Sequence, residues 1–230
     1  MKGGDATMIF GIESTYPSNG KLTNGYRLFD WVMRKQDVPR FWLRGITGEY
    51  GVTREEMAFL KANGCRTALV LNGLTERIVS QNGAVPEAQR ALEALRRLRV
   101  PSFSEIALFV RFAPNWSMNH NWMLSFAYTL CENGYIPGFI GNTDSSKRFR
   151  FDRECGHYKH ASEADSRFGA LFGATEPESD APPESWTPFC PSDFTQSDMS
   201  LWETGGRVVC GDVCANVVYV RDEAICKHFL

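Results

Sequence analysis

The sequence predicts an α/β protein, a single (β/α)8 barrel of the TIM type that spans residues 1–230. Short apolar runs typical of strands alternate four times with helical segments, and 230 residues is a length that one such barrel often fills. The runs are continuously apolar rather than alternating, which is typical of parallel strands buried on both faces. An open, doubly wound sheet would show the same alternation and stays as the second possibility.

The first half of the chain has the most regular pattern. Apolar runs predict strands at 8–14, 40–46 and 67–74. Between the last two, Thr53 and Glu56 form a capping box in front of a helix, and Gly64 supplies a left-handed stop. The segment 86–100 has apolar residues at helical spacing and a proline in its first turn, so we expect a helix there.

The second half is less regular, so we expect the barrel to be irregular there. We predict strands at 106–112 and 135–142 with a helix at 119–134 between them, a short helix at 160–174, and final strands at 201–206 and 213–220. The proline-rich acidic stretch 175–185 is typical of a surface loop.

Composition argues against two classes of partner. With 25 basic and 27 acidic side chains and a net charge of -2, the chain has no overall cationic field for nucleic acid. It also lacks a run of about 18 apolar residues that would span a membrane. We expect residues 1–7 to be a leader, and the compartment stays open: cytoplasmic, or secreted with the signal trimmed. The seven cysteines fit no compact disulfide framework, so reduced thiols are expected.

Several catalytic motifs are absent from the sequence. It contains no glycine-rich phosphate loop, no GxSxG elbow and no HExxH zinc signature, and we expect no cofactor. Cys155, His157 and His160 are spaced like metal ligands, but no paired-cysteine knuckle accompanies them, so we expect a solvated loop and no metal. A thiol nucleophile served by His120 or His157 is a further alternative, which would need an open sheet.

Acidic and aromatic residues near the strand ends favour a sugar-directed chemistry. Hydrolysis of a glycosidic bond needs one carboxyl group as acid and usually a second as base, nucleophile or stabiliser. The strand-end acids are Glu13, Glu49, Asp144, Glu203 and Asp212. Aromatic rings can stack on the apolar faces of sugars, and the candidates outside the expected core are Tyr16, Trp116, Trp186 and Trp202.

The order of these pieces resembles the glycoside-hydrolase-like domains catalogued as domain of unknown function 1906, relatives of the family 25 lysozymes. The run Gly11-Ile12-Glu13-Ser14-Thr15 is similar to that family's first strand, where an aspartate precedes Ser or Thr. The segments 44–73 and 185–206 look like its strand–helix–strand unit and its Leu-Trp-Gln signature. The resemblance implies a TIM-type barrel and a hydrolase acting on a cell-wall polysaccharide such as peptidoglycan.

Two departures from that family put the mechanism in doubt. The lysozymes end their fourth strand in Asp-x-Glu, where this chain has Val110-Arg111-Phe112, and an arginine cannot serve as general acid. The last strand of the lysozymes ends in Asp-x-Asn, where this chain has Cys214-Ala215-Asn216. Only Glu13 can be carried over as a catalytic acid. We therefore keep two hypotheses. One is a glycosidase that uses Glu13 with Asp144 or Glu203; the other is a barrel without catalysis that binds a glycan or protein through Glu13, Arg111, Trp116, Trp202 and Tyr16.

Overall fold

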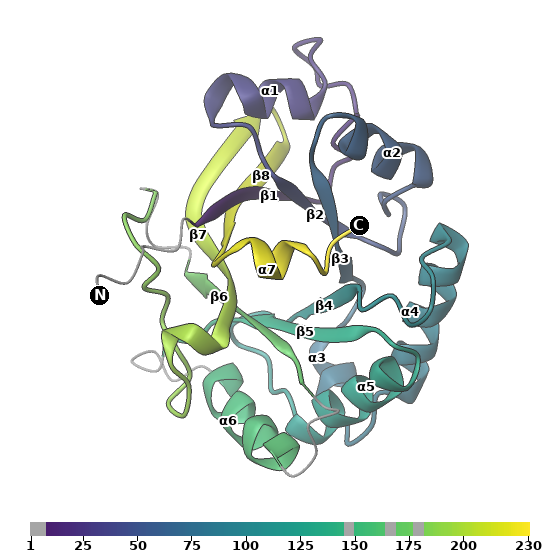
Figure 1. Ribbon diagram of the computed structural model, residues 1–230, viewed down its shortest axis with the longest axis vertical. Helices are drawn as coiled ribbons and strands as arrows, with labels where there is room; N and C mark the ends of the chain where they lie inside the picture. The colour runs from purple at the N-terminus through teal and green to yellow at the C-terminus, as the bar shows by residue number, and fades with distance from the viewer. Residues whose placement is uncertain (1–7, 145–149, 164–168, 177–181) are drawn as a thin grey trace.

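The structure is a computed structural model, in which residues 8–144, 150–163, 169–176 and 182–230 are described. Its strands close into a barrel whose order follows the chain, as predicted (Figure 1). The eight strands are β1 Ile9–Ser14, β2 Phe41–Gly45, β3 Arg66–Leu71, β4 Ala107–Arg111, β5 Ile136–Gly141, β6 Leu171–Glu176, β7 Met199–Cys210 and β8 Val213–Val220. The expected leader, residues 1–7, lies outside the described residues.

The last strand departs from a uniformly parallel barrel. Strands β1 to β7 pair in parallel, whereas β8 runs antiparallel to both of its neighbours, β7 and β1. The reason is the connection: Cys210 of β7 pairs with Val213 of β8, so only two residues form the turn, with Gly211 at a φ of +57°. A parallel crossover needs a dozen residues or more, so a two-residue turn makes a hairpin. The irregularity predicted for the second half is therefore real.

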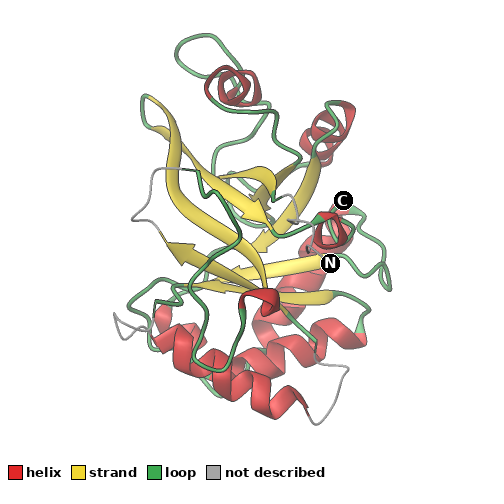
Figure 2. Cartoon of the chain, turned by 60° about the vertical axis from the view of Figure 1, so that its left-hand side comes forward, coloured by secondary structure: helices red, strands yellow, loops and turns green. Residues whose placement is uncertain are grey.

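The helices lie outside the barrel. Helices α4, α5 and α6 pack side by side along one side of it, and Figure 2 shows α1 and α2 at the opposite side. Capping explains several of the helix ends: the Thr53 hydroxyl accepts from the Glu56 amide at 3.1 Å, and Gly64 has a φ of +71°. The helices are α1 Leu28–Lys35, α2 Arg54–Ala62, α3 Glu76–Val79, α4 Val85–Leu98, α5 His120–Glu132, α6 Arg150–Glu163 and α7 Glu223–Cys226.

The helix predicted at 160–174 is wrong. The helix lies earlier, as α6, and the segment from Leu171 onward is strand β6, paired with β5 and β7. Helix α6 buries Phe151, Cys155 and Tyr158, which recur at helical spacing within a charged segment expected to be a loop. Phe172 packs edge-on to Phe194, so the short apolar run of β6 is stabilised by long-range contacts that its local sequence does not show.

Apolar side chains fill the barrel interior and close one of its ends. The interior holds residues such as Leu43, Val70 and Leu201, and the chain end after α7 adds Phe229, whose ring lies 5.3 Å from that of Phe41. This plug sits at the end where the parallel strands begin, as α7 in the foreground of Figure 1 shows. Polar chemistry is therefore left to the opposite rim, where β1 to β7 end.

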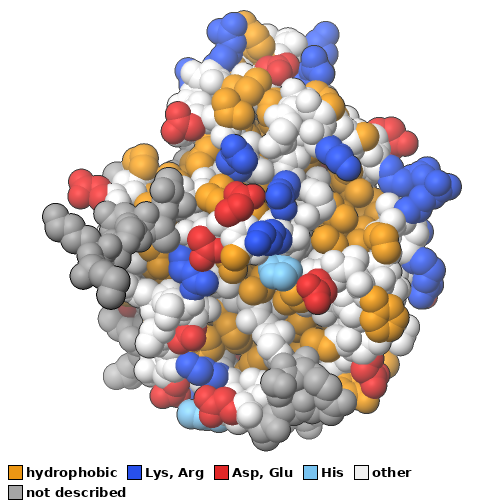
Figure 3. Space-filling model, viewed as in Figure 1, with side chains coloured by type: hydrophobic (Ala, Val, Ile, Leu, Met, Phe, Trp, Pro, Cys, Tyr) orange, Lys and Arg blue, Asp and Glu red, His pale blue; other side chains and the backbone are white. Residues whose placement is uncertain are grey.

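The molecular surface agrees with the balanced charge of the sequence. On the face around α7, Figure 3 shows basic and acidic side chains interspersed, without an extended patch of one sign. Among the described residues, no helix has the length and apolar character needed to cross a bilayer. All seven cysteines are free thiols.

Candidate functional site

The rim of the barrel brings together three charged residues from distant parts of the chain. Glu13 lies near the end of β1, Arg111 ends β4, and Glu203 lies on β7. Arg111 donates from Nη2 to Oε2 of Glu13 and from Nη1 to Oε2 of Glu203. The two carboxylates therefore share one guanidinium. Their side chains are only 17% and 8% exposed, against 28% for Arg111, so the group is largely shielded from water.

Further hydrogen bonds fix Glu203 in this group. Asn216 on β8 donates from Nδ2 to Oε1 of Glu203 at 2.8 Å, and the Thr175 hydroxyl on β6 lies 3.3 Å from Oε2. Arg111 also donates to that hydroxyl at 3.2 Å. Four strands and the antiparallel β8 thus contribute to one polar cluster across the open end of the barrel.

Burial changes the protonation of Glu13. Desolvation raises the pKa of Glu13 to about 7; the Arg111 charge and hydrogen bond oppose this rise, and the neighbouring Glu203 carboxylate adds to it. Arg111 contacts Glu13 and favours its ionised form, but burial outweighs this effect, so this carboxyl carries a proton over much of the range below neutral pH.

Beside the cluster lies a cavity of about 440 Å³ into which Glu13 and Arg111 face. Its wall also includes Trp116 and Tyr50, from the loops after β4 and β2, and Asn72, which follows β3. Asn72 is held by Thr47, whose backbone amide donates to Oδ1 at 2.9 Å. A cavity of this size, with aromatic walls and a few polar groups, is typical of a small-ligand site.

A buried arginine shapes the same cavity. Arg44 on β2 is fully buried and pairs with Glu56 of α2, Nε to Oε1 at 2.8 Å. Its two terminal nitrogens donate to the backbone carbonyls of Ser14, Thr15 and Tyr50 at 2.6 to 2.8 Å. Arg44 therefore ties together the loops that follow β1 and β2. The side chain positions the cavity wall through the backbone.

The other predicted site residues lie in different places. Tyr16 stands at the rim, its ring 6.3 Å from that of Tyr50 and its hydroxyl bonded to the Lys21 carbonyl. Trp202 lies on the outer face of β7, edge-on to Trp186 and 5.9 Å from it, whereas Glu203 faces inward. Trp202 lines a separate hollow of about 330 Å³.

Asp144 is buried beyond the end of β5, where its amide donates to Asn142 at 2.9 Å. It is not among the described contacts of Arg111 or the described walls of the cavity. Of the other strand-end acids, Glu49 lines the cavity, and Asp212 is exposed in the hairpin turn.

The metal ligands considered in the sequence do not form one group. Cys155, His157 and His160 lie on helix α6 rather than on a solvated loop, and Cys155 points into the apolar core. Burial raises the pKa of the Cys155 thiol well above its usual range, which disfavours the reactive thiolate form. His160 lies 3.3 Å from Asp193.

Sequence reasoning missed four polar residues that shape the site: Arg44, Asn72, Thr175 and Asn216. The first two had a usable signal, because each stands at or just after the end of an apolar run predicted to be a strand. Thr175 follows a run that was predicted to be helical. Asn216 was noted only as a remnant of a family pattern, since nothing local places it opposite Glu203.

Comparisons with known proteins support the barrel fold. No protein-family model and no curated protein matches the sequence. Among solved structures, an uncharacterized protein of B. stearothermophilus is similar over 96% of this chain and 100% of its own, with a TM-score of 0.74 and 22% identity.

Two more distant structures are similar as well. A Tat-secreted protein of Mycobacterium tuberculosis, solved in complex with HEPES, covers 93% of this chain and 95% of its own, with a TM-score of 0.57 and 13% identity. The spore cortex lytic enzyme SleM of Clostridium perfringens is similar over 93% of this chain and 67% of its own, with a TM-score of 0.50 and 9% identity. At these identities the similarity is one of fold, which a lytic enzyme shares.

Proposed function

We propose that this protein hydrolyses glycosidic bonds of a polysaccharide at the open rim of the barrel, with Glu13 as the general acid. The observation that carries the proposal is the state of Glu13: a largely buried carboxyl, facing a cavity, with a pKa raised to about 7 and a second carboxylate bound to the same guanidinium. A proton donor to a leaving oxygen needs to hold its proton at the working pH.

Glu203 is the partner in this proposal. A glycosidase needs a second carboxyl group that attacks the sugar, activates water or stabilises positive charge in the transition state. Hydrogen bonds from Arg111 and Asn216 hold the Glu203 carboxylate in place. Arg111 stays protonated and donates no proton to substrate. Its role is to hold the two carboxyl groups at a fixed separation.

The cavity wall fits a carbohydrate. Trp116 and Tyr50 supply aromatic rings to the wall, with Tyr16 beside Tyr50, and Asn72 adds a polar side chain. Sugars present both apolar faces and hydroxyl groups, so rings and polar groups in one wall match their chemistry. The barrel shared with a spore cortex lytic enzyme supports a cell-wall polysaccharide such as peptidoglycan as the substrate class.

A second function, glycan binding without catalysis, is favoured by one specific observation. The Arg111 guanidinium contacts both carboxylates and takes up hydrogen-bonding positions that a substrate hydroxyl or an attacking water would use. In that case the same cluster would serve as the polar floor of a recognition site.

The decisive test is hydrolysis of purified peptidoglycan and of a panel of soluble polysaccharides by the wild type and by Glu13→Gln. Asp212→Asn is the matched control, because it changes an exposed strand-end acid outside the cavity. Turnover by the wild type and the control, with at least a ~100-fold loss in Glu13→Gln, is the expected result. Glycan binding without turnover in all three proteins would favour glycan recognition over hydrolysis. An absence of both binding and turnover would reject both proposed functions.

A further inference from the structure

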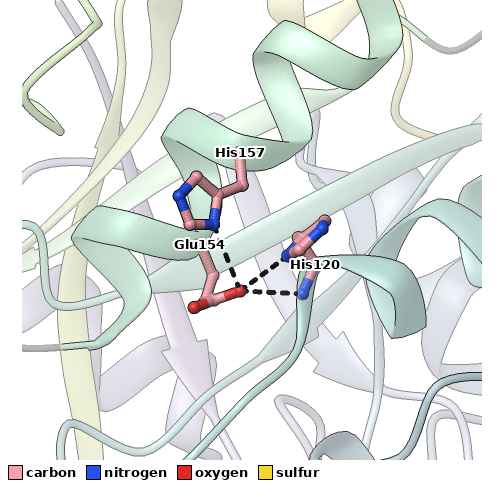
Figure 4. A group of neighbouring side chains, drawn as sticks. All are labelled: His120, Glu154 and His157. Carbon is pink, nitrogen blue, oxygen red and sulfur yellow. Dashed lines mark hydrogen bonds and ion pairs between the residues drawn. The ribbon is translucent and has the colours of Figure 1, made fainter.

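Three side chains from two helices form a second cluster on the outside of the barrel. His120 begins α5, and Glu154 and His157 lie one turn apart on α6. Figure 4 shows both imidazoles directed at the Glu154 carboxylate. Nδ1 of His120 lies 2.9 Å from Oε2 of Glu154, and Nδ1 of His157 lies 3.8 Å from the same oxygen. The ligand atoms of the three residues all lie within 4.8 Å of one another.

The carboxylate at the centre of this cluster is held rigidly. Glu154 is only 7% exposed, and its Oε2 also accepts a hydrogen bond from the His120 amide at 3.1 Å. Arg153 holds the other oxygen, Oε1, at 2.7 and 2.9 Å. Such outer contacts fix the orientation of a ligand carboxylate. The position of Oε2 is therefore set before any ion binds.

His157 is the part of the cluster that helix packing does not explain. The His120–Glu154 bond joins α5 to α6 by itself, whereas the His157 side chain is 51% exposed and its ring lies 5.1 Å from that of His120. Two imidazoles this close repel each other when both are protonated. A shared cation between them and the carboxylate would remove that repulsion and use all three groups.

We propose that His120, Glu154 and His157 bind a divalent transition-metal ion, with zinc as the best-matched metal. Two imidazole nitrogens and one carboxylate oxygen are a known zinc donor set, and three protein ligands leave a fourth position for water or another ligand. Two ligand atoms that each lie about 2.0–2.1 Å from the same tetrahedral ion are separated by a distance between the observed 2.9 and 3.8 Å. Small side-chain rotations would therefore bring the two imidazoles and the carboxylate to binding distance. Magnesium and calcium prefer oxygen ligands and fit less well.

Metal binding at this site would restrain the loop after β4 that carries Trp116. Trp116, on the cavity wall, precedes His120 by four residues in the loop after β4, and the Ser117 amide of that loop donates to Glu76 at 2.7 Å. A bound ion would join the end of this loop to α6. The metal site does not depend on the proposed hydrolysis, because Glu13 and Glu203 take no part in it.

Calorimetric titration of ZnCl2 into the chelator-treated full-length protein tests the proposal. We expect one zinc per chain and a rise in melting temperature with added zinc. Loss of a ligand in His157→Ala should weaken zinc affinity by at least about 10- to 100-fold, the effect typical of losing even an outer partner. His160→Ala is the matched control. It removes an exposed histidine one turn further along the same helix, paired with Asp193 outside the cluster, and should bind zinc like the wild type.

His157→Ala also keeps the test independent of folding, since it leaves the His120–Glu154 hydrogen bond intact. Equal zinc affinity in the wild type, His157→Ala and His160→Ala would show that surface histidines bind zinc without a built site. That result, or an absence of binding to the wild type, would overturn the proposal.

Discussion

Glu13 and Glu203 approach each other across a single guanidinium, from the two strands that flank the antiparallel β8. Arg111, which ends β4, supplies the cation, and Glu203 supplies the second carboxyl from β7. The charged groups at the rim thus come from three strands, β1, β4 and β7, that are not neighbours along the chain.

The pH dependence of turnover follows from the raised pKa of Glu13. A general acid works in its protonated form, so kcat/KM should fall about tenfold per pH unit above pH 7. The pH–rate profile on a soluble glycan fragment measures this. A profile that rises through pH 7 would instead make Glu13 a base or nucleophile.

Stability should depend on the same proton. The Glu13 carboxyl titrates near 4.5 when unfolded and near 7 when folded, so the folded state binds more protons between these values. Stability is therefore highest below pH 4.5 with respect to this group and is lost as the pH rises towards 7, by about 1–3 kcal/mol. Urea unfolding at pH 5 and pH 8 should show this loss in the wild type. Glu13→Gln should show a smaller one, and equal losses would contradict the raised pKa.

The buried Arg44–Glu56 pair should be sensitive to removal of one partner. Arg44→Met leaves the Glu56 charge buried and frees the carbonyls of Ser14 and Tyr50, so it should cost about 3–5 kcal/mol in the free energy of unfolding. The exposed Arg27–Asp30 pair is the control, and Arg27→Met should cost less than about 1 kcal/mol. Denaturant unfolding compares them. Similar costs for both variants would show that Arg44 does not organise the rim.

Substitution of Trp116 should weaken ligand binding, whereas substitution of Trp202 should lower the stability of the fold. Trp116→Ala removes a ring from the cavity wall and should weaken binding of an oligosaccharide about 3- to 10-fold, with little change in stability. Trp202→Ala empties a buried position outside the barrel and should cost about 3–5 kcal/mol of stability, with binding unchanged in the folded fraction. Calorimetry and urea unfolding measure the two effects. The reverse outcome would assign Trp202 to the binding surface.

Much of the fold was predictable because its signals are local. The apolar runs that form β1 to β5 and the capping residues Thr53 and Gly64 act within a few neighbours, and the structure confirms them. Helix α6 and strand β6 were not predicted correctly. The buried face of α6 is interleaved with charges, and the short run at Phe172 gains its strand conformation from pairing with β5 and β7.

The candidate site was predictable only in part for the same reason. Glu13 could be selected because it ends an apolar run, and Arg111 because it stands where the resembled family has an acidic residue. Parallel strands bring their ends to one rim. Which second carboxyl joins them depends on the inward or outward alternation of β7, and the sequence left Asp144 and Glu203 as equal candidates. Trp202 and Glu203 are adjacent in sequence yet point to opposite faces of that strand.

The sequence by itself therefore determined most of the alternating elements, the α/β class and the acidic and aromatic residues at the strand ends, because hydrophobic periodicity and capping are properties of neighbouring residues. Only the tertiary structure decided the antiparallel course of β8, the sharing of Arg111 by Glu13 and Glu203, the contact of Asn216 with that cluster, and the meeting of His120 with Glu154 and His157. Barrel closure and strand register join residues up to about two hundred positions apart, and no local pattern encodes those distances.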